Sequence, residues 1–173
     1  MDVMSGLAFG LMVVLLVTAF VQDVTQTKIS NKLTLPFMGL GLVAAFIHEG
    51  IPGVMQAMVS MVVLFVILFV LFLIGAVGAG DVKLFAAIGA IGGMELSLLG
   101  LLYSILYAGV IGLLIWTLRH TLGAQLKRIY HFIWTAIVLK SRKVWHTASS
   151  QTSHFPFMWA VLPGMTTAYF MLV

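Results

Sequence analysis

Residues 54–84 read VMQAMVSMVVLFVILFVLFLIGAVGAGDVKL. The run from Val54 to Val77 carries no charged side chain and is long enough for a helix that crosses a bilayer. It leads into Gly78-Ala79-Gly80, and Asp81 and Lys83 follow at once. Because an ionised carboxylate is costly inside hydrocarbon, membrane proteins keep acids where water, a partner or a function supports them. The segment therefore predicts a membrane helix followed by a candidate functional acid.

The whole chain has the composition of a membrane protein. Its 173 residues are 62% hydrophobic and 8% charged, with a mean hydropathy of +1.16. This leaves too little polar surface to cover a water-soluble globule. The uncharged stretches predict an all-α polytopic protein with about six transmembrane helices, in a single membrane domain over residues 1–173. The stretches are Met4–Gln22, Leu33–Ile47, Val54–Val77, Leu84–Met94, Leu96–Leu118 and Pro156–Val173.

One helix break is predicted from length alone. A single helix over Leu84–Leu118 would measure roughly 50 Å, well beyond a hydrocarbon core of about 30 Å. Gly92-Gly93-Met94-Glu95 is the expected break. Small residues four apart are candidates for close helix contacts, because they let backbones approach in lipid. These pairs are Gly6 and Gly10, Ala86 and Ala90, Gly89 and Gly93, and Ser104 and Ala108.

The basic residues predict the orientation. With six spans, all nine Lys and Arg fall on one side of the membrane, whereas the other side receives only Asp2, Glu49 and Glu95. Basic loops stay in the cytoplasm, so Asp23 and Asp81 are expected to face the cytosol. The net charge of +4 follows from this asymmetry, and nucleic-acid binding is not inferred.

The longest predicted extramembrane segment, residues 119–155, is basic and lies between the fifth and sixth spans. Within it, residues 129–139 are apolar and flanked by Lys127, Arg128 and Lys140. These features fit a helix lying in the cytosolic interface. A basic loop held near anionic lipid is the alternative.

Two acids, Asp23 and Asp81, end apolar runs on the same predicted side. Each by itself fits an ordinary boundary residue in contact with water. The glycines before Asp81 allow close backbone approach, and the start of the following helix favours a negative charge. Matching surroundings on one membrane face favour a shared site.

The residues around both acids resemble a known family. Residues 78–84, followed by Ala86-Ala87-Ile88-Gly89, are similar to the Gly-x-Gly-Asp signature of the type IV prepilin leader peptidases. Asp23 with Ile29-Ser30-Asn31-Lys32-Leu33 resembles their first aspartate box. Phe155-Pro156-Phe157, with Gly164 farther on, resembles their C-terminal Pro-Phe segment.

The resemblance implies a membrane aspartic endopeptidase that cleaves the basic leader from type IV prepilin or pseudopilin-like precursors at the cytosolic face of the bacterial inner membrane. It assigns catalysis to Asp23 and Asp81 without a cofactor or metal. Gly78 and Gly80 would shape the second catalytic loop, and Lys83 and Asn31 complete the motifs. The precursor and the lipid bilayer are the expected partners. Substrate-binding residues and oligomeric state stay open.

Two departures from the family pattern matter. Ser30 stands where the first box usually has proline, which leaves the shape of that loop open. The chain has no cysteine, whereas larger relatives carry a tetracysteine zinc region and also methylate the new N-terminus. The resemblance is therefore to the short, peptidase-only form, and methylation is not expected.

Three alternatives remain. In the first, the protein is a transporter in which Asp23 and Asp81 form a proton or cation site. Transporters often consist of repeated halves with the site near the middle of the membrane, and the sequence shows neither a repeat nor an acid in the middle of a span. A non-catalytic partner in pilus or secretion assembly would tolerate loss of both acids. Presenilin-like proteases share Gly-x-Gly-Asp, but their first acid lies in a Tyr-Asp setting, whereas Asp23 follows Gln22.

Overall fold

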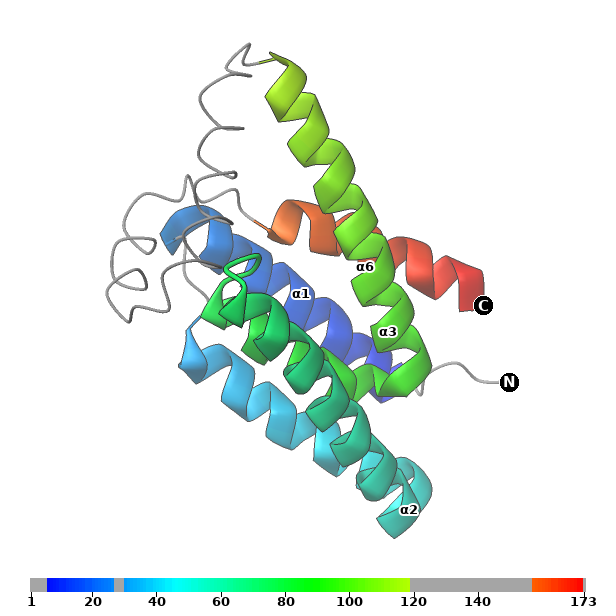
Figure 1. Cartoon of the computed structure of the whole chain (residues 1–173). Coiled ribbons are helices and arrows are strands. Elements are labelled where there is room, and N and C mark those ends of the chain that lie inside the picture. The colour runs from blue at the N-terminus through cyan, green and yellow to red at the C-terminus, as the bar shows by residue number, and fades with distance from the viewer. Residues whose placement is uncertain (1–5, 27–29, 119–156, 173) are drawn as a thin grey trace. The chain divides into compact units, whose positions relative to one another are not determined.

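The described part of the chain is entirely helical. The computed structural model describes residues 6–26, 30–118 and 157–172, and no strand occurs among them (Figure 1). The helices are α1 (Gly6–Gln26), α2 (Asn31–Leu73), α3 (Ala79–Leu118) and α6 (Met158–Leu172). The predicted all-α class is therefore confirmed.

Three helices, α1, α2 and α3, are long and apolar enough to cross a membrane, whereas α6 is apolar but shorter. The basic segment 119–155, with its predicted interfacial helix, lies outside the described residues. Six spans and a single domain over residues 1–173 therefore stay predictions. The packing and the site described below lie in the compact unit formed by Met1–Ala108 and Pro156–Val173.

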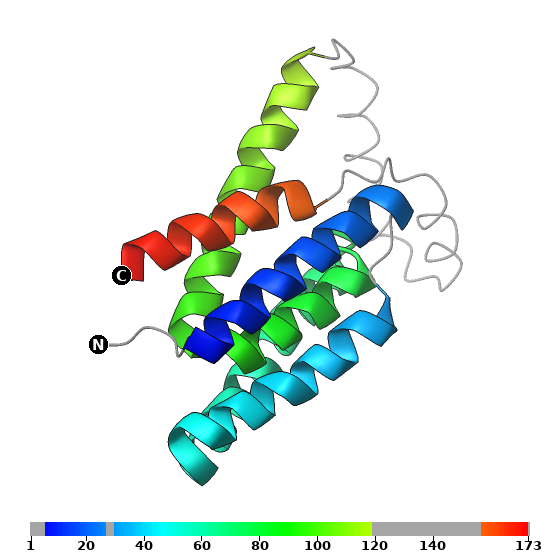
Figure 2. The ribbon, with the colours of Figure 1, turned by 180° about the vertical axis from the view of Figure 1, so that it is seen from behind.

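Each of the two longest helices is interrupted at a glycine. Gly50 in α2 has φ 68° and ψ −145°, and Gly93 in α3 has φ 70° and ψ −174°. This left-handed region favours glycine, because a Cβ would clash there. The chain reverses near Gly50, so the two halves of α2 run side by side (Figures 1 and 2). The first break falls between two stretches predicted as separate spans, and the second lies within the expected Gly92–Glu95 break, at the end of the Leu84–Met94 stretch.

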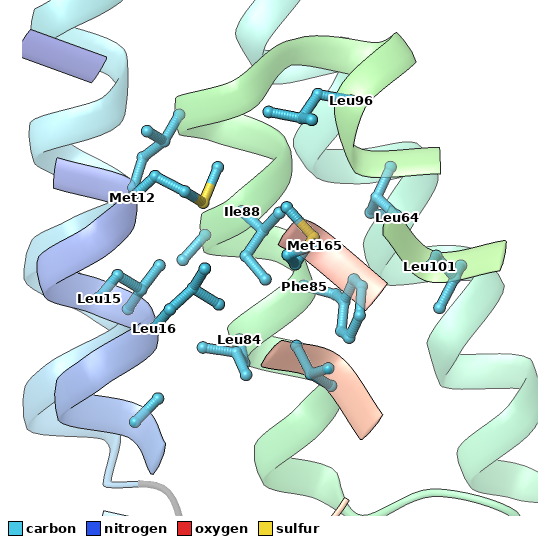
Figure 3. Close-up of a cluster of buried hydrophobic side chains, with 14 of the residues drawn as sticks. Met12, Leu15, Leu16, Leu64, Leu84, Phe85, Ile88, Leu96, Leu101 and Met165 are labelled. Carbon is cyan, nitrogen blue, oxygen red and sulfur yellow. The ribbon is translucent and has the colours of Figure 1, made fainter. Parts of the chain in front are cut away.

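The first half of α3 is the central helix of this unit. Val82 and all of residues 84–91 are buried, so this segment is covered on every side, which is typical of a core helix. Figure 3 shows Phe85 and Ile88 of α3 among Leu15 of α1 and Met165 of α6. Asp81 therefore lies at the start of the most enclosed helix.

Small residues allow the closest helix contacts. A Cβ built on Gly89 of α3 would lie 2.9 Å from the Ser60 carbonyl oxygen of α2, and one on Gly41 would lie 2.9 Å from the Ala90 carbonyl carbon. Between α6 and α3, a Cβ on Gly164 would lie 2.6 Å from the Ser104 backbone nitrogen. Several of the predicted small residues therefore mark helix contacts. In contrast, a Cβ on Gly6 or Gly10 would have no neighbour within 4 Å.

Gly89→Ala is expected to lower the free energy of unfolding by about 1–3 kcal/mol, because its Cβ would force α3 away from the α2 backbone. Gly39→Ala is the matched control, since a Cβ there meets nothing within 4 Å. It should be neutral or stabilising by up to about 1 kcal/mol. Denaturant titration in detergent micelles, followed by circular dichroism, measures both. Equal stability of the two variants would contradict the close contact.

Candidate active site

Asp81 lies in the first turn of α3, where its carboxylate caps the helix. Its backbone N–H donates to the Gly78 carbonyl oxygen over 3.1 Å, and the Gly78 N–H donates back to Asp81 Oδ2 over 3.1 Å. This reciprocal pairing resembles a capping box, with the negative charge at the positive end of the helix dipole. The acid is thus held by the start of its own helix.

The two glycines before Asp81 lie in different settings. A Cβ on Gly78 would lie 3.3 Å from Asp81 Oδ2, so the absence of a side chain leaves room for the carboxylate. Gly80, predicted to shape the catalytic loop, already belongs to the first turn of α3. The non-helical segment before the acid therefore ends at Gly78.

Asp23 lies in the last turn of α1, and its carboxylate is held by the start of another helix. Asp23 Oδ2 accepts a hydrogen bond of 3.3 Å from the backbone N–H of Met158, the first residue of α6. The first N–H groups of a helix have no partner within that helix. The C-terminal helix thus supplies a donor, and its positive dipole end, to an acid 135 residues earlier.

The two acids share one region. Both are half-buried, and their carboxylates are close enough for their negative charges to interact. Phe157, directly before α6, also contacts Phe85, one turn after Asp81, with ring centroids 6.4 Å apart. Residues from α1, α3 and the start of α6 therefore meet around one acid pair.

The predicted motif residues Asn31 and Lys83 join the starts of two helices. Lys83 Nζ donates a hydrogen bond of 2.7 Å to Asn31 Oδ1, across 52 positions of sequence. Asn31 is the first residue of α2, and Lys83 follows Asp81 by two positions. This contact connects the first aspartate box to the second.

Gln22 and Met158 were not predicted as site residues. Gln22 Oε1 accepts a hydrogen bond of 3.0 Å from the Ser30 N–H, which joins the last turns of α1 to the beginning of α2. Its position next to Asp23 was the only signal in the sequence. Met158 acts through its backbone, so its side chain gives no signal, although it directly follows the Pro-Phe segment.

An apolar cavity of about 260 Å³ lies away from the acids. Residues of α1, α3 and α6 line it, among them Phe9, Leu96 and Tyr169, and no acid is among them. Within the described ranges, no group of three or more His, Cys, Asp or Glu residues is arranged to hold a metal ion.

Comparison with known proteins identifies one family. The family model described as the type IV leader peptidase family matches residues 10–113. The match includes both acids, Ser30, Asn31 and Lys83, but ends before α6. Searches of curated proteins and of solved structures found no match.

The Asn31–Lys83 contact is testable by a double-mutant cycle. Asn31→Ala and Lys83→Met should each destabilise the protein, and their combined effect should be smaller than the sum by about 1 kcal/mol, because each single change already breaks the bond. Unfolding free energies in detergent provide the measurement.

The control cycle replaces Lys83→Met by Lys32→Met, since exposed Lys32 neighbours Asn31 in sequence but adjacent helical residues do not face each other. Strict additivity in the Asn31–Lys83 cycle would show that this contact does not join α2 to α3.

Proposed function

Because the chain belongs to the type IV leader peptidase family, we propose that it cleaves the basic leader from prepilin-like precursors with Asp23 and Asp81 as the catalytic acids. The family match supports a peptidase. The observation that carries the aspartic mechanism is the electrostatic interaction of two half-buried carboxylates, each of which accepts a backbone N–H at the start of a helix. Such a pair is suited to hydrolysis without a covalent intermediate.

The proposed chemistry follows from sharing one proton. Two carboxylates at close range do not both ionise readily, so one is neutral and the other charged. The charged carboxylate removes a proton from water, and the water oxygen bonds to the scissile carbonyl carbon. The neutral carboxylic acid donates its proton to the carbonyl oxygen. Collapse of the tetrahedral intermediate then breaks the C–N bond. The leaving nitrogen takes the proton that the first carboxylate removed from water, and the re-forming carbonyl returns its proton to the second carboxylate.

The hydrogen bonds at the two acids support the sharing of one proton between them. Asp23 receives the Met158 N–H and Asp81 receives the Gly78 N–H, each at Oδ2. Helix N-termini stabilise negative charge, so either acid can carry the charge at modest cost. An interacting pair titrates as a unit, and the proposal therefore assigns the proton to the pair.

Membrane topology supports the choice of substrate. The clustering of all nine Lys and Arg in predicted loops on one side favours an orientation with both acids at the cytosolic face of the inner membrane. A precursor with a cytosolic basic leader and an apolar membrane helix presents its junction at that depth. The three apolar helices are consistent with a membrane enzyme that meets this junction.

One observation favours a second, non-catalytic role for Asp81. Its hydrogen bond to the Gly78 N–H caps α3, and a purely structural acid would do the same. Asp81→Asn separates the two roles, because the amide oxygen still accepts this bond but the side chain no longer shares a proton with Asp23.

Asp23→Asn and Asp81→Asn are each expected to reduce cleavage by at least about 1,000-fold, since either change removes one member of the acid pair. Cleavage of a co-expressed precursor, with a basic leader and one apolar helix, is followed by its shift in electrophoretic mobility. Membrane accumulation of each variant is measured in parallel.

Glu95→Gln is the matched control, because Glu95 is an exposed acid beyond the break in α3. It should cleave at the rate of the unaltered chain. Retained cleavage by either Asp variant would remove that residue from the mechanism, and complementation by the double variant would favour an assembly role.

A further inference from the structure

The apolar cavity lined by α1, α3 and α6 has a buried floor and an exposed rim. Its volume is about 260 Å³. Met12, Leu16 and Met165 line it and are buried, and Figure 3 shows them in the hydrophobic core cluster. Val13 and Phe170 also line it but are 42% and 75% exposed. The cavity therefore opens at the surface of the helices, and the acid-pair chemistry does not use it.

The two helices that form most of the lining run antiparallel from the first acid. Near Asp23, Phe20 of α1 contacts Trp159 of α6 with ring centroids 5.7 Å apart. Toward the other end, Phe9 contacts Tyr169 with centroids 5.0 Å apart. Figures 1 and 2 both show α6 crossing alongside α1 in the opposite chain direction. The cavity thus lies on the contact between helices that begins at the candidate active site.

The distance of the cavity from the acids can be counted along both helices. The lining residues of α1 fall within residues 9–16, and those of α6 fall within residues 165–170. These ranges lie 7–14 positions before Asp23 and 7–12 positions after Met158, whose N–H binds Asp23. At 1.5 Å per residue, both counts place the cavity roughly 10–20 Å from this acid.

A precursor cleaved at the acids would bring its own helix to this depth. In the proposed orientation, the apolar helix of the precursor enters the membrane from the cytosolic face and runs in the chain direction of α6. If that helix begins at the cleaved bond, its residues about 7 to 14 positions after the bond lie level with the cavity.

The size and lining of the cavity fit one large apolar side chain. An apolar cavity of about 150 Å³ is enough to bind benzene, so this one accommodates a Leu or Phe side chain but not a whole helix. No charged residue lines it, which excludes the basic leader. A lipid chain is equally apolar, but a side chain on a helix already held at the acids loses less freedom when it fills the cavity.

We propose that this cavity is a docking site for one large apolar side chain of the precursor's membrane helix, about 7 to 14 residues after the cleaved bond. The enzyme then recognises the apolar helix of its substrate as well as the junction with the leader. This inference rests on the proposed peptidase function.

The first test compares two substrates with purified enzyme in detergent. One is a precursor with its complete apolar helix, and the other is a peptide that ends about five residues after the cleaved bond, too short to reach the cavity. Val13→Trp fills the cavity from its rim. It should raise the KM for the complete precursor, relative to the KM for the peptide, by about 10-fold, because packing in the cavity is lost.

Val14→Trp is the matched control, because Val14 is 51% exposed and does not line the cavity. It should leave the ratio of the two KM values unchanged. An unchanged ratio in Val13→Trp would show that lipid or detergent alone fills the cavity, and would overturn the docking site while the peptidase function stands. Failure of the unaltered enzyme to cleave either substrate would reject both.

The second test locates the docked side chain without measuring cleavage. The chain has no cysteine, so Thr166→Cys places a single thiol on the exposed rim of the cavity. Asp81→Asn is included so that the precursor stays intact. Disulfide formation with precursors that carry one cysteine each should peak about 7 to 14 residues after the bond, and Val14→Cys should give no such peak. Equal crosslinking at all precursor positions, or from both enzyme thiols, would overturn the docking site.

Discussion

A carboxylate at the edge of a membrane helix needs hydrogen-bond donors, and helix N-termini supply them here. Asp81 takes the Gly78 N–H at the start of its own helix, whereas Asp23 takes the Met158 N–H at the start of α6. The bond between the Met158 N–H and Asp23 also joins α1 to the C-terminal helix α6. The contact of Phe157 with Phe85 then brings the same segment beside the helix of Asp81.

The two acids are supported in different ways. Asp81 begins a helix segment that is buried on all sides and touches the α2 backbone at Gly89, so apolar packing fixes its position. Asp23 ends α1, whose outer face carries exposed Val13, Val17 and Val21. The inner face of α1 is packed through buried Leu15 and Ala19, and the Met158 N–H adds a hydrogen bond from another helix at Asp23.

The sequence allowed prediction of features that depend on local composition. Apolar runs and length predicted the helices and the break at Gly93, and motif spacing singled out both acids. The apolar runs did not predict where the helices end. Hydropathy indicates which residues contact lipid, whereas the ends of a helix are set by capping residues such as Ser30. Thus α1 continues to Gln26, beyond the expected Gln22. The Met158 and Gln22 contacts depend on tertiary packing, which no single-chain pattern encodes.

Three of the hydrogen bonds described around the acids use main-chain donors. The N–H groups of Met158, Gly78 and Ser30 bind Asp23, Asp81 and Gln22, whereas Lys83 contributes through its side chain. A main-chain donor survives any substitution except proline. The bond to Asp23 therefore does not depend on which side chain, other than proline, stands at position 158. A signature made of side-chain identities therefore leaves out the donor that binds the first acid.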